Sequence, residues 1–386
     1  MKLLSPLQAA KLTRPGAVQG AAVTAAAGGI PWGKLRDTGS SALSTLLTTA
    51  AGATFSPNKR RVFVLANGDL IVFSATAGRI STLGGSTGTA VAIAAGDIIA
   101  DVAQSQANRN VFLAATQAGK IHRVVADSAQ NLSATLLESD FAADTTYPAG
   151  HWRTLSLSWD EALNVLIVAY LRESGSEFTA IAALYTVGTG SLTFRSASAA
   201  SVTLSGPSIA TGPVALSATR RQADGKILYA AATGTTGSPR LGAAIITHTA
   251  TTVTVATPGV QDVGSFGTAP RLSLHDALAV MFHSDNSVSQ LAFEAAWAGA
   301  GTVPGTASAY ALHGADVAGG VQGDTFHAAS GAALRGQAAG LPIVLEHLQD
   351  AGFNGLCAVA LADGAGLAFA DTDGTDLRLR LLRATS

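Results

Sequence analysis

The chain has 386 residues, of which 48% are hydrophobic and only 13% are charged, and its net charge is −1. The hydrophobic content excludes a generally disordered chain, and the near-neutral charge argues against a dedicated nucleic-acid binder. A single cysteine, Cys357, excludes an intrachain disulfide and a cysteine-rich metal site.

The start of the chain does not predict a signal peptide. Gln8, Lys11 and Arg14 interrupt the apolar run of 7–15 residues that such a segment requires. The most apolar runs, such as 165–171, last about seven residues, whereas a membrane helix needs about 20. We therefore expect synthesis in a host cytoplasm, no signal peptide and no membrane insertion.

Residues 1–50 predict an extended basic N-terminal arm. This segment has five basic residues and one acidic residue, hence a charge of +4, whereas residues 51–386 have a charge of −5. Such asymmetry indicates a segment with its own partner. The arm either docks on a neighbouring subunit or wraps the protein's own ring and completes a blade, and both arrangements can hold together. The candidate docking residues are Lys2, Lys11, Arg14, Trp32, Lys34 and Arg36.

From residue 60 onward a pattern of about fifty residues recurs. Each copy has a short strand, a polar turn and a stronger apolar strand, most clearly in 155–158, Asp160-Glu161 and 165–168. The stronger strands are expected to begin at residues 62, 111, 165, 227, 280, 326 and 367. Helical periodicity is confined to the stretch around 341–348.

Four strands in about fifty residues, repeated six or seven times, are typical of a β-propeller. Over residues 52–384 the chain resembles the β-propeller superfamily in architecture, without a kelch Gly-Gly pair in register. We expect an all-β fold in which residues 51–386 form a propeller of about seven four-stranded blades behind the irregular N-terminal arm. Ring closure requires pairing between strands of the two termini. Six or eight blades, a β-sandwich pair and a β-helix are the alternatives.

One cluster of aromatic and cationic residues precedes the third repeat. Tyr147, His151, Trp152 and Arg153 are expected in a loop on one face of the ring. Such side chains can form a ligand or receptor face, because Trp, Tyr and Arg dominate many interfaces. The alternative is packing between blades.

Acidic residues recur in the turns of the repeats. Asp160, Asp224 and Asp276 follow the first strand of successive copies, and we interpret them as turn caps, since Asp side chains accept backbone N–H bonds there. A metal site formed by His275, Asp276, His283 and Asp285 is a weaker alternative. No motif requires catalysis, so we expect no catalytic residue, metal or cofactor.

The low charge, the Ala, Gly and Thr content and the basic arm give the chain a resemblance to bacteriophage tail and virion proteins. That resemblance implies a non-catalytic structural or interaction protein located in the virion, in a tail or tail fibre. The implied partners are other virion proteins, a host surface receptor or glycan, and further copies of the chain. The alternatives are a bacterial carbohydrate-binding or scaffold propeller, and a lactonase or glycan-cleaving propeller.

Overall fold

The structure is a computed structural model. It describes residues 35–41, 62–302, 325–328, 333–337, 345–348, 355–360, 366–372 and 377–384, with gaps inside 62–302 at 74–76, 82–88, 90, 95, 128–130, 139–140, 142–146, 148, 175–176, 203–213, 221–224, 234–239, 258–260, 263–270, 276–277, 283–286 and 293–296. Side chains are described for most of these residues between 62 and 257.

The described residues form seven antiparallel sheets. Sheet I contains β2 (Val62–Val64), β3 (Leu70–Phe73), β4 (Ala77–Ser81) and β5 (Val91–Ala92). Sheet II contains β6 (Ile99–Gln104), β7 (Val111–Thr116), β8 (Ile121–Ala126) and β9 (Leu132–Glu138). Sheet III contains β10 (Ser156–Asp160), β11 (Val165–Ser174), β12 (Glu177–Val187) and β13 (Leu192–Val202).

The remaining sheets follow in chain order. Sheet IV contains β14 (Val214–Arg220), β15 (Ile227–Thr233), β16 (Arg240–His248), β17 (Val253–Ala256) and β18 (Gln261–Asp262). Sheet V contains β19 (Arg271–His275), β20 (Leu278–Phe282), β21 (Ser287–Ala292) and β22 (Trp297–Thr302). Sheet VI contains β23 (Thr325–Ala328), β24 (Ala333–Gln337) and β25 (Leu345–Leu348). Sheet VII contains β26 (Gly355–Ala360), β27 (Gly366–Thr372), β28 (Leu377–Ala384) and β1 (Leu35–Ser41).

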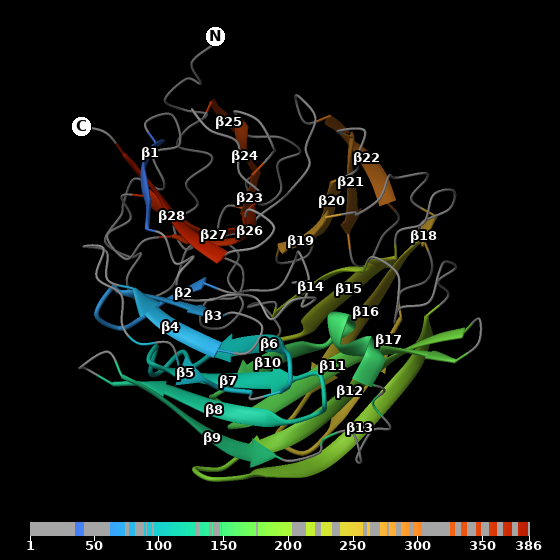
Figure 1. Cartoon of the computed structure of the whole chain (residues 1–386). Helices are drawn as coiled ribbons and strands as arrows, with labels where there is room; N and C mark the ends of the chain where they lie inside the picture. Colours follow the sequence, from blue (N-terminus) through green and yellow to red (C-terminus); the bar gives the residue numbers. More distant parts are fainter. Residues whose placement is uncertain are drawn as a thin grey trace.

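The sheets follow one another around a common centre (Figure 1). Within each sheet the strands pair in chain order except for β1, which pairs with β28, and β18, which pairs with β16. The first strands of sheets II to V contact one another in sequence, β6 with β10, β10 with β14 and β14 with β19, and β26 contacts both β2 and β23. This all-β arrangement is compatible with a β-propeller.

Sheet VII joins the two ends of the described chain. Strand β1 pairs antiparallel with β28, from Leu35 opposite Ala384 to Ser41 opposite Leu379, with a register shift between Asp37 and Gly39. The strand order β1-β28-β27-β26 places β1 at the sheet edge farthest from β26. Part of the predicted arm therefore belongs to the sheet that contains the C-terminal strands.

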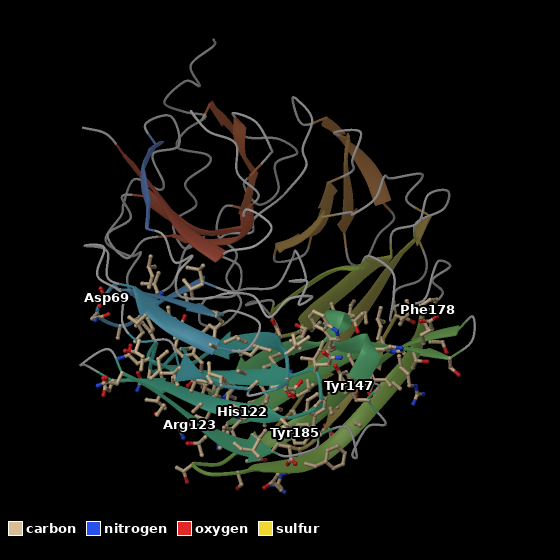
Figure 2. All side chains as sticks on the ribbon, in the orientation of Figure 1. Asp69, His122, Arg123, Tyr147, Phe178 and Tyr185 are labelled. Atoms are coloured by element: carbon tan, nitrogen blue, oxygen red, sulfur yellow. The ribbon has the colours of Figure 1, made fainter. Side chains whose placement is uncertain are left out.

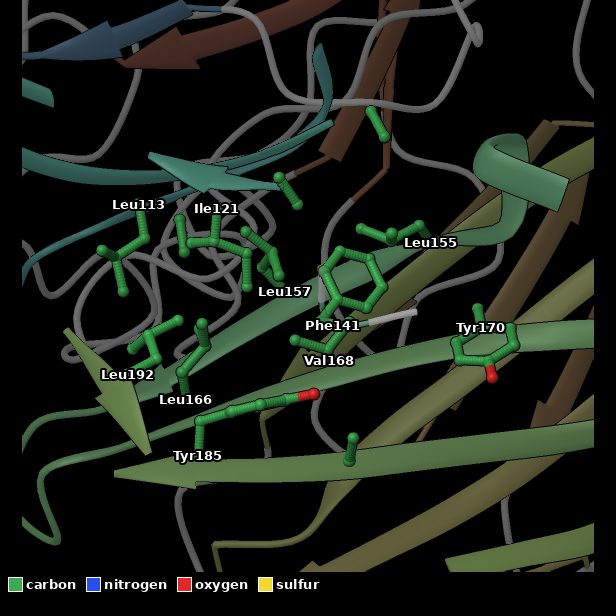
Figure 3. Close-up of a cluster of buried hydrophobic side chains, with 14 of the residues drawn as sticks. Leu113, Ile121, Phe141, Leu155, Leu157, Leu166, Val168, Tyr170, Tyr185 and Leu192 are labelled. Carbon is green, nitrogen blue, oxygen red and sulfur yellow. The ribbon is translucent and has the colours of Figure 1, made fainter. Parts of the chain in front are cut away.

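Among the described side chains, the hydrophobic core lies between successive sheets from I to IV, because each of these sheets presents an apolar face to its neighbour. One cluster joins sheets I and II, a second joins II and III, and a third joins III and IV. Between sheets I and II the rings of Phe63, Phe73 and Phe112 meet edge to face, with centroids 5.4–5.7 Å apart. Between sheets II and III the side chains of Leu113 and Ile121 lie beside Leu166 and Val168 (Figure 3).

The repeat predicted the positions of most strands. Expected starts at 111, 165, 227, 280 and 367 fall in β7, β11, β15, β20 and β27, which are the second strands of their sheets. The expected starts at 62 and 326 fall instead in β2 and β23, which are first strands. The helical interpretation of 341–348 is wrong for Leu345–Leu348, which pairs with β24 as a strand. In a short apolar run, pairing with a neighbouring strand outweighs a weak helical pattern.

None of the helices among the described residues has the length and apolar character needed to cross a membrane. A short 3₁₀ helix, η3 (Ala149–Thr154), lies between sheets II and III.

Candidate functional site

The turns between first and second strands form a connected row at one end of sheets I to III. We call residues 65–69, 105–110 and 161–164 the turn belt. A side chain of sheet II binds the turn of sheet I, and a side chain of sheet III binds the turn of sheet II. The belt begins with Asn110 of sheet II, whose Oδ1 accepts a hydrogen bond from the backbone N–H of Ala66 at 2.9 Å.

Glu161 makes the strongest link of the turn belt, between sheets II and III. Its Oε1 accepts from the Ser105 hydroxyl at 2.5 Å, and its Oε2 accepts from the backbone N–H groups of Gln106 and of Ala107, the latter at 2.8 Å. Hydrogen bonds to an ionised acceptor are stronger than neutral ones. One carboxylate thus satisfies three donors of the neighbouring turn.

Asp160 connects the same turn to sheet IV. Its Oδ1 accepts from the backbone N–H groups of Ala162 and Leu163 at 3.1 and 3.3 Å, which confirms the predicted turn cap at this position. Its Oδ2 lies 3.0 Å from Nε2 of His248, and both side chains are almost fully buried. An ionised carboxylate only accepts, so with Asp160 in that form Nε2 of His248 is the donor. The buried Nδ1 of His248 has no hydrogen-bond partner among the described residues.

Two further links satisfy backbone donors at sheet edges. At the inner edge, the buried Asp101 of β6 accepts from the Leu157 N–H of β10 through Oδ2 at 2.8 Å. At the rim, the hydroxyls of Ser196 and Ser198 in β13 accept from the N–H groups of Val253 and Val255 in β17, each at 3.0 Å. Unpaired edge groups invite pairing with other chains, so these side chains also protect the edges.

The predicted aromatic cluster lies in the interior. Tyr147 and Trp152 are 6% and 7% exposed and belong to the core between sheets II and III. The Tyr147 ring packs against Phe141 and edge-on against Tyr170, and its burial raises the Tyr147 pKa well above the ordinary value. Figure 2 places Tyr147 inside the fold, in contrast to Asp69 at the periphery. Packing between sheets II and III therefore buries the rings of Tyr147 and Trp152, and little of either ring is exposed to a ligand.

His151 is also buried, in the 3₁₀ helix η3. Its Nδ1 lies 3.1 Å from the Leu171 carbonyl and 3.3 Å from the Glu173 N–H. Burial lowers the His151 pKa, whereas the Leu171 bond and the Glu173 charge oppose that shift. Next to it, the Thr154 carbonyl accepts from the Tyr229 hydroxyl of sheet IV at 2.7 Å. The segment thus fastens sheet III to sheet IV.

Several predicted residues cannot be assigned contacts. Lys2, Lys11, Arg14, Trp32 and Lys34 lie outside the described residues, as does the Arg153 side chain. The backbone of Arg36 lies in β1, opposite Arg383 of β28. Of the other turn residues, Asp224 and Asp276 also lie outside the described part.

Sequence reasoning missed the partners of these links. No local motif indicates Glu161, Asp101 or His248, because their partners lie 54–88 residues away. Within the described part of the chain, no group of three or more His, Cys, Asp or Glu side chains is placed to hold a metal ion. The described geometry therefore joins sheets and does not gather ligands at one point.

Comparisons with known proteins identify architecture alone. No protein family matches the sequence, and no curated protein matches it either. Among solved structures, 748 chains match, including Raptor from Chaetomium thermophilum, a WD40 β-propeller protein. The chain shares 10% sequence identity with Raptor at a TM-score of 0.55, and the match covers 92% of this chain but 29% of Raptor. At that identity the likeness concerns the fold, and the chain spans less than a third of Raptor's length.

Proposed function

We propose that the seven sheets are the blades of a closed β-propeller, with β1 as the outer strand of the C-terminal blade. The pairing of β1 with β28 and the contact of β26 with β2 support this closure, because they bring the last sheet to the first strand of sheet I. A ring closed in this way leaves no blade with an uncovered apolar face.

A disulfide between β1 and β28 tests the closure. In a Cys357→Ser background, cysteines replace either Ser40 and Arg380 or Ser41 and Leu379, which are adjacent register pairs. Successive antiparallel pairs alternate between about 4.5 and 5.5 Å between Cα atoms, so at least one pair suits a disulfide. We expect an intrachain disulfide that raises the melting temperature. Failure of both pairs to form one would contradict the closure.

The function that we propose is that of a non-catalytic structural protein in a bacteriophage virion, in the tail or tail fibre. The supporting observation is the use made of the carboxylates: Asp101, Asp160 and Glu161 each bind groups of a neighbouring sheet or turn. Such links make a rigid scaffold. Residues 1–34 contain four basic and no acidic residues and join the scaffold through β1, at a sheet edge. From that edge they dock on a neighbouring virion protein.

Two truncations separate docking from closure. Deleting 1–34 keeps β1, so the protein folds with an unchanged melting temperature but is not incorporated into particles. Deleting 1–41 also removes β1, so the melting temperature falls as well. The measurements are thermal unfolding of the purified proteins and mass spectrometry of purified particles from complemented phage.

Absence of the full-length protein from purified particles would refute the virion role. Normal incorporation of the chain lacking 1–34 would refute docking through the arm. Hydrolysis of a lactone or glycan panel by the pure protein would favour an enzyme instead.

A further inference from the structure

Strand β13 is the longest last strand of any sheet in the described part of the chain. It has eleven residues, whereas the last strands β5, β9 and β17 have two, seven and four. It pairs with β12 on one side, and no described strand pairs with its other edge. Every second residue of such a strand turns its N–H and C=O toward the free edge.

The devices that usually protect an edge are missing from the second half of β13. The register shift opposite Leu184 and Tyr185 places a bulge at Arg195, and the strand then runs regularly from Ser196 to Val202. These seven residues contain no proline, lysine or other charge. Natural edge strands are protected by charges, proline or bulges. The corresponding N–H groups of β17 are covered, because Ser196 and Ser198 bind them.

The side chains leave room for a second strand. Ala197, Ala199 and Ser201 are exposed on one face, and Ser196 and Ser198 are turned to β17 on the other. All are small, so another backbone can approach without displacing a large side chain.

We propose that this edge, Ser196–Val202, is a self-association surface at which two copies of the chain pair their β13 strands antiparallel. A two-fold axis at Ala199 places Ala199 opposite itself, Ser198 opposite Ala200 and Ala197 opposite Ser201, so small uncharged residues face one another. The two Arg195 residues then lie at opposite ends of the shared strands, about 27 Å apart at about 3.4 Å per residue. No like charges meet, and the two sheets III become one continuous sheet.

A charge at the axis tests the surface in the full chain. Ala199→Lys places two lysines directly opposite each other in the dimer, and Ala199→Glu places two carboxylates there. Like charges in that position destabilise strand pairs by up to about 1 kcal/mol, which raises the dimer dissociation constant about fivefold. An equimolar mixture of the two variants places Lys opposite Glu and restores association. Thr193→Lys, an exposed position before the bulge, is the matched control and retains the wild-type constant.

Analytical ultracentrifugation over a concentration series gives these constants, and thermal unfolding checks that each variant is folded. A wild-type chain that stays monomeric at the highest concentration overturns the proposal. So does equal association of Ala199→Lys and wild type, or a mixture that associates no better than either variant alone. If deletion of residues 1–34 abolishes self-association and Ala199→Lys does not weaken it, the arm and not β13 carries the self-association. The test does not depend on the virion role.

Discussion

Replacement of Glu161 by alanine tests the central link of the turn belt. The change removes the acceptor of three hydrogen bonds, from Ser105, Gln106 and Ala107. A hydrogen bond to a charged group contributes about 1.5–3 kcal/mol. Ala107 is exposed and Glu161 half-buried, so water replaces part of the loss. We expect the free energy of unfolding to fall by about 2–3 kcal/mol rather than by the full sum.

The assay is thermal unfolding at neutral pH, together with hydrogen exchange at the Gln106 and Ala107 amides. In a chain of this size the expected loss lowers the melting temperature by about 3 °C. The melting temperature of Glu161→Gln, which keeps one acceptor oxygen, lies between those of Glu161→Ala and the wild type. A melting temperature within about 1 °C of wild type, with unchanged exchange at both amides, would refute the reasoning.

Three further predictions concern the core and the segment between sheets II and III. Phe112→Ala removes the shared member of the aromatic trio and lowers the free energy of unfolding by about 3–5 kcal/mol, as measured by urea unfolding. Tyr229→Phe removes the hydroxyl that donates to the buried Thr154 carbonyl, and it lowers the free energy of unfolding by about 1 kcal/mol in the same assay. Because burial lowers the folded-state pKa of His151, the unfolded chain binds a proton first as pH falls through about 6.5, and stability declines below that pH. Between pH 7 and 5 the free energy of unfolding declines less in His151→Gln than in the wild type. An identical decline in both would mean that another group causes the pH dependence. His122→Gln is the comparison, because burial and Lys120 lower the His122 pKa as well.

The strand pattern was predictable because it is local. Alternating or continuous apolar runs between polar turns predict strands wherever one face is buried, as in β11 and β15. Asp160 could be interpreted as a turn cap for the same reason, since its partners are two and three residues away.

The links between sheets could not be predicted, because their partners are set by stacking. His248 reaches Asp160 across 88 residues, and nothing near either residue in the sequence indicates the pair. The aromatic residues near 147–152 illustrate the same limit. Their composition fits a binding face as well as a packed interior, and only the position of sheets II and III distinguishes the two.

The adjacent pair Asp160-Glu161 explains how one turn can hold three sheets. Neighbouring residues of an extended chain point in opposite directions, so two consecutive carboxylates cannot serve the same partner. In the structure Glu161 binds the turn of sheet II, and Asp160 binds His248 of sheet IV. Removing both carboxylates would therefore remove this turn's hydrogen bonds to sheet II and to sheet IV at once. Because the two bonds share one turn of four residues, the losses should exceed the sum of the single replacements, and a Glu161→Gln, Asp160→Asn double-mutant cycle measures that coupling.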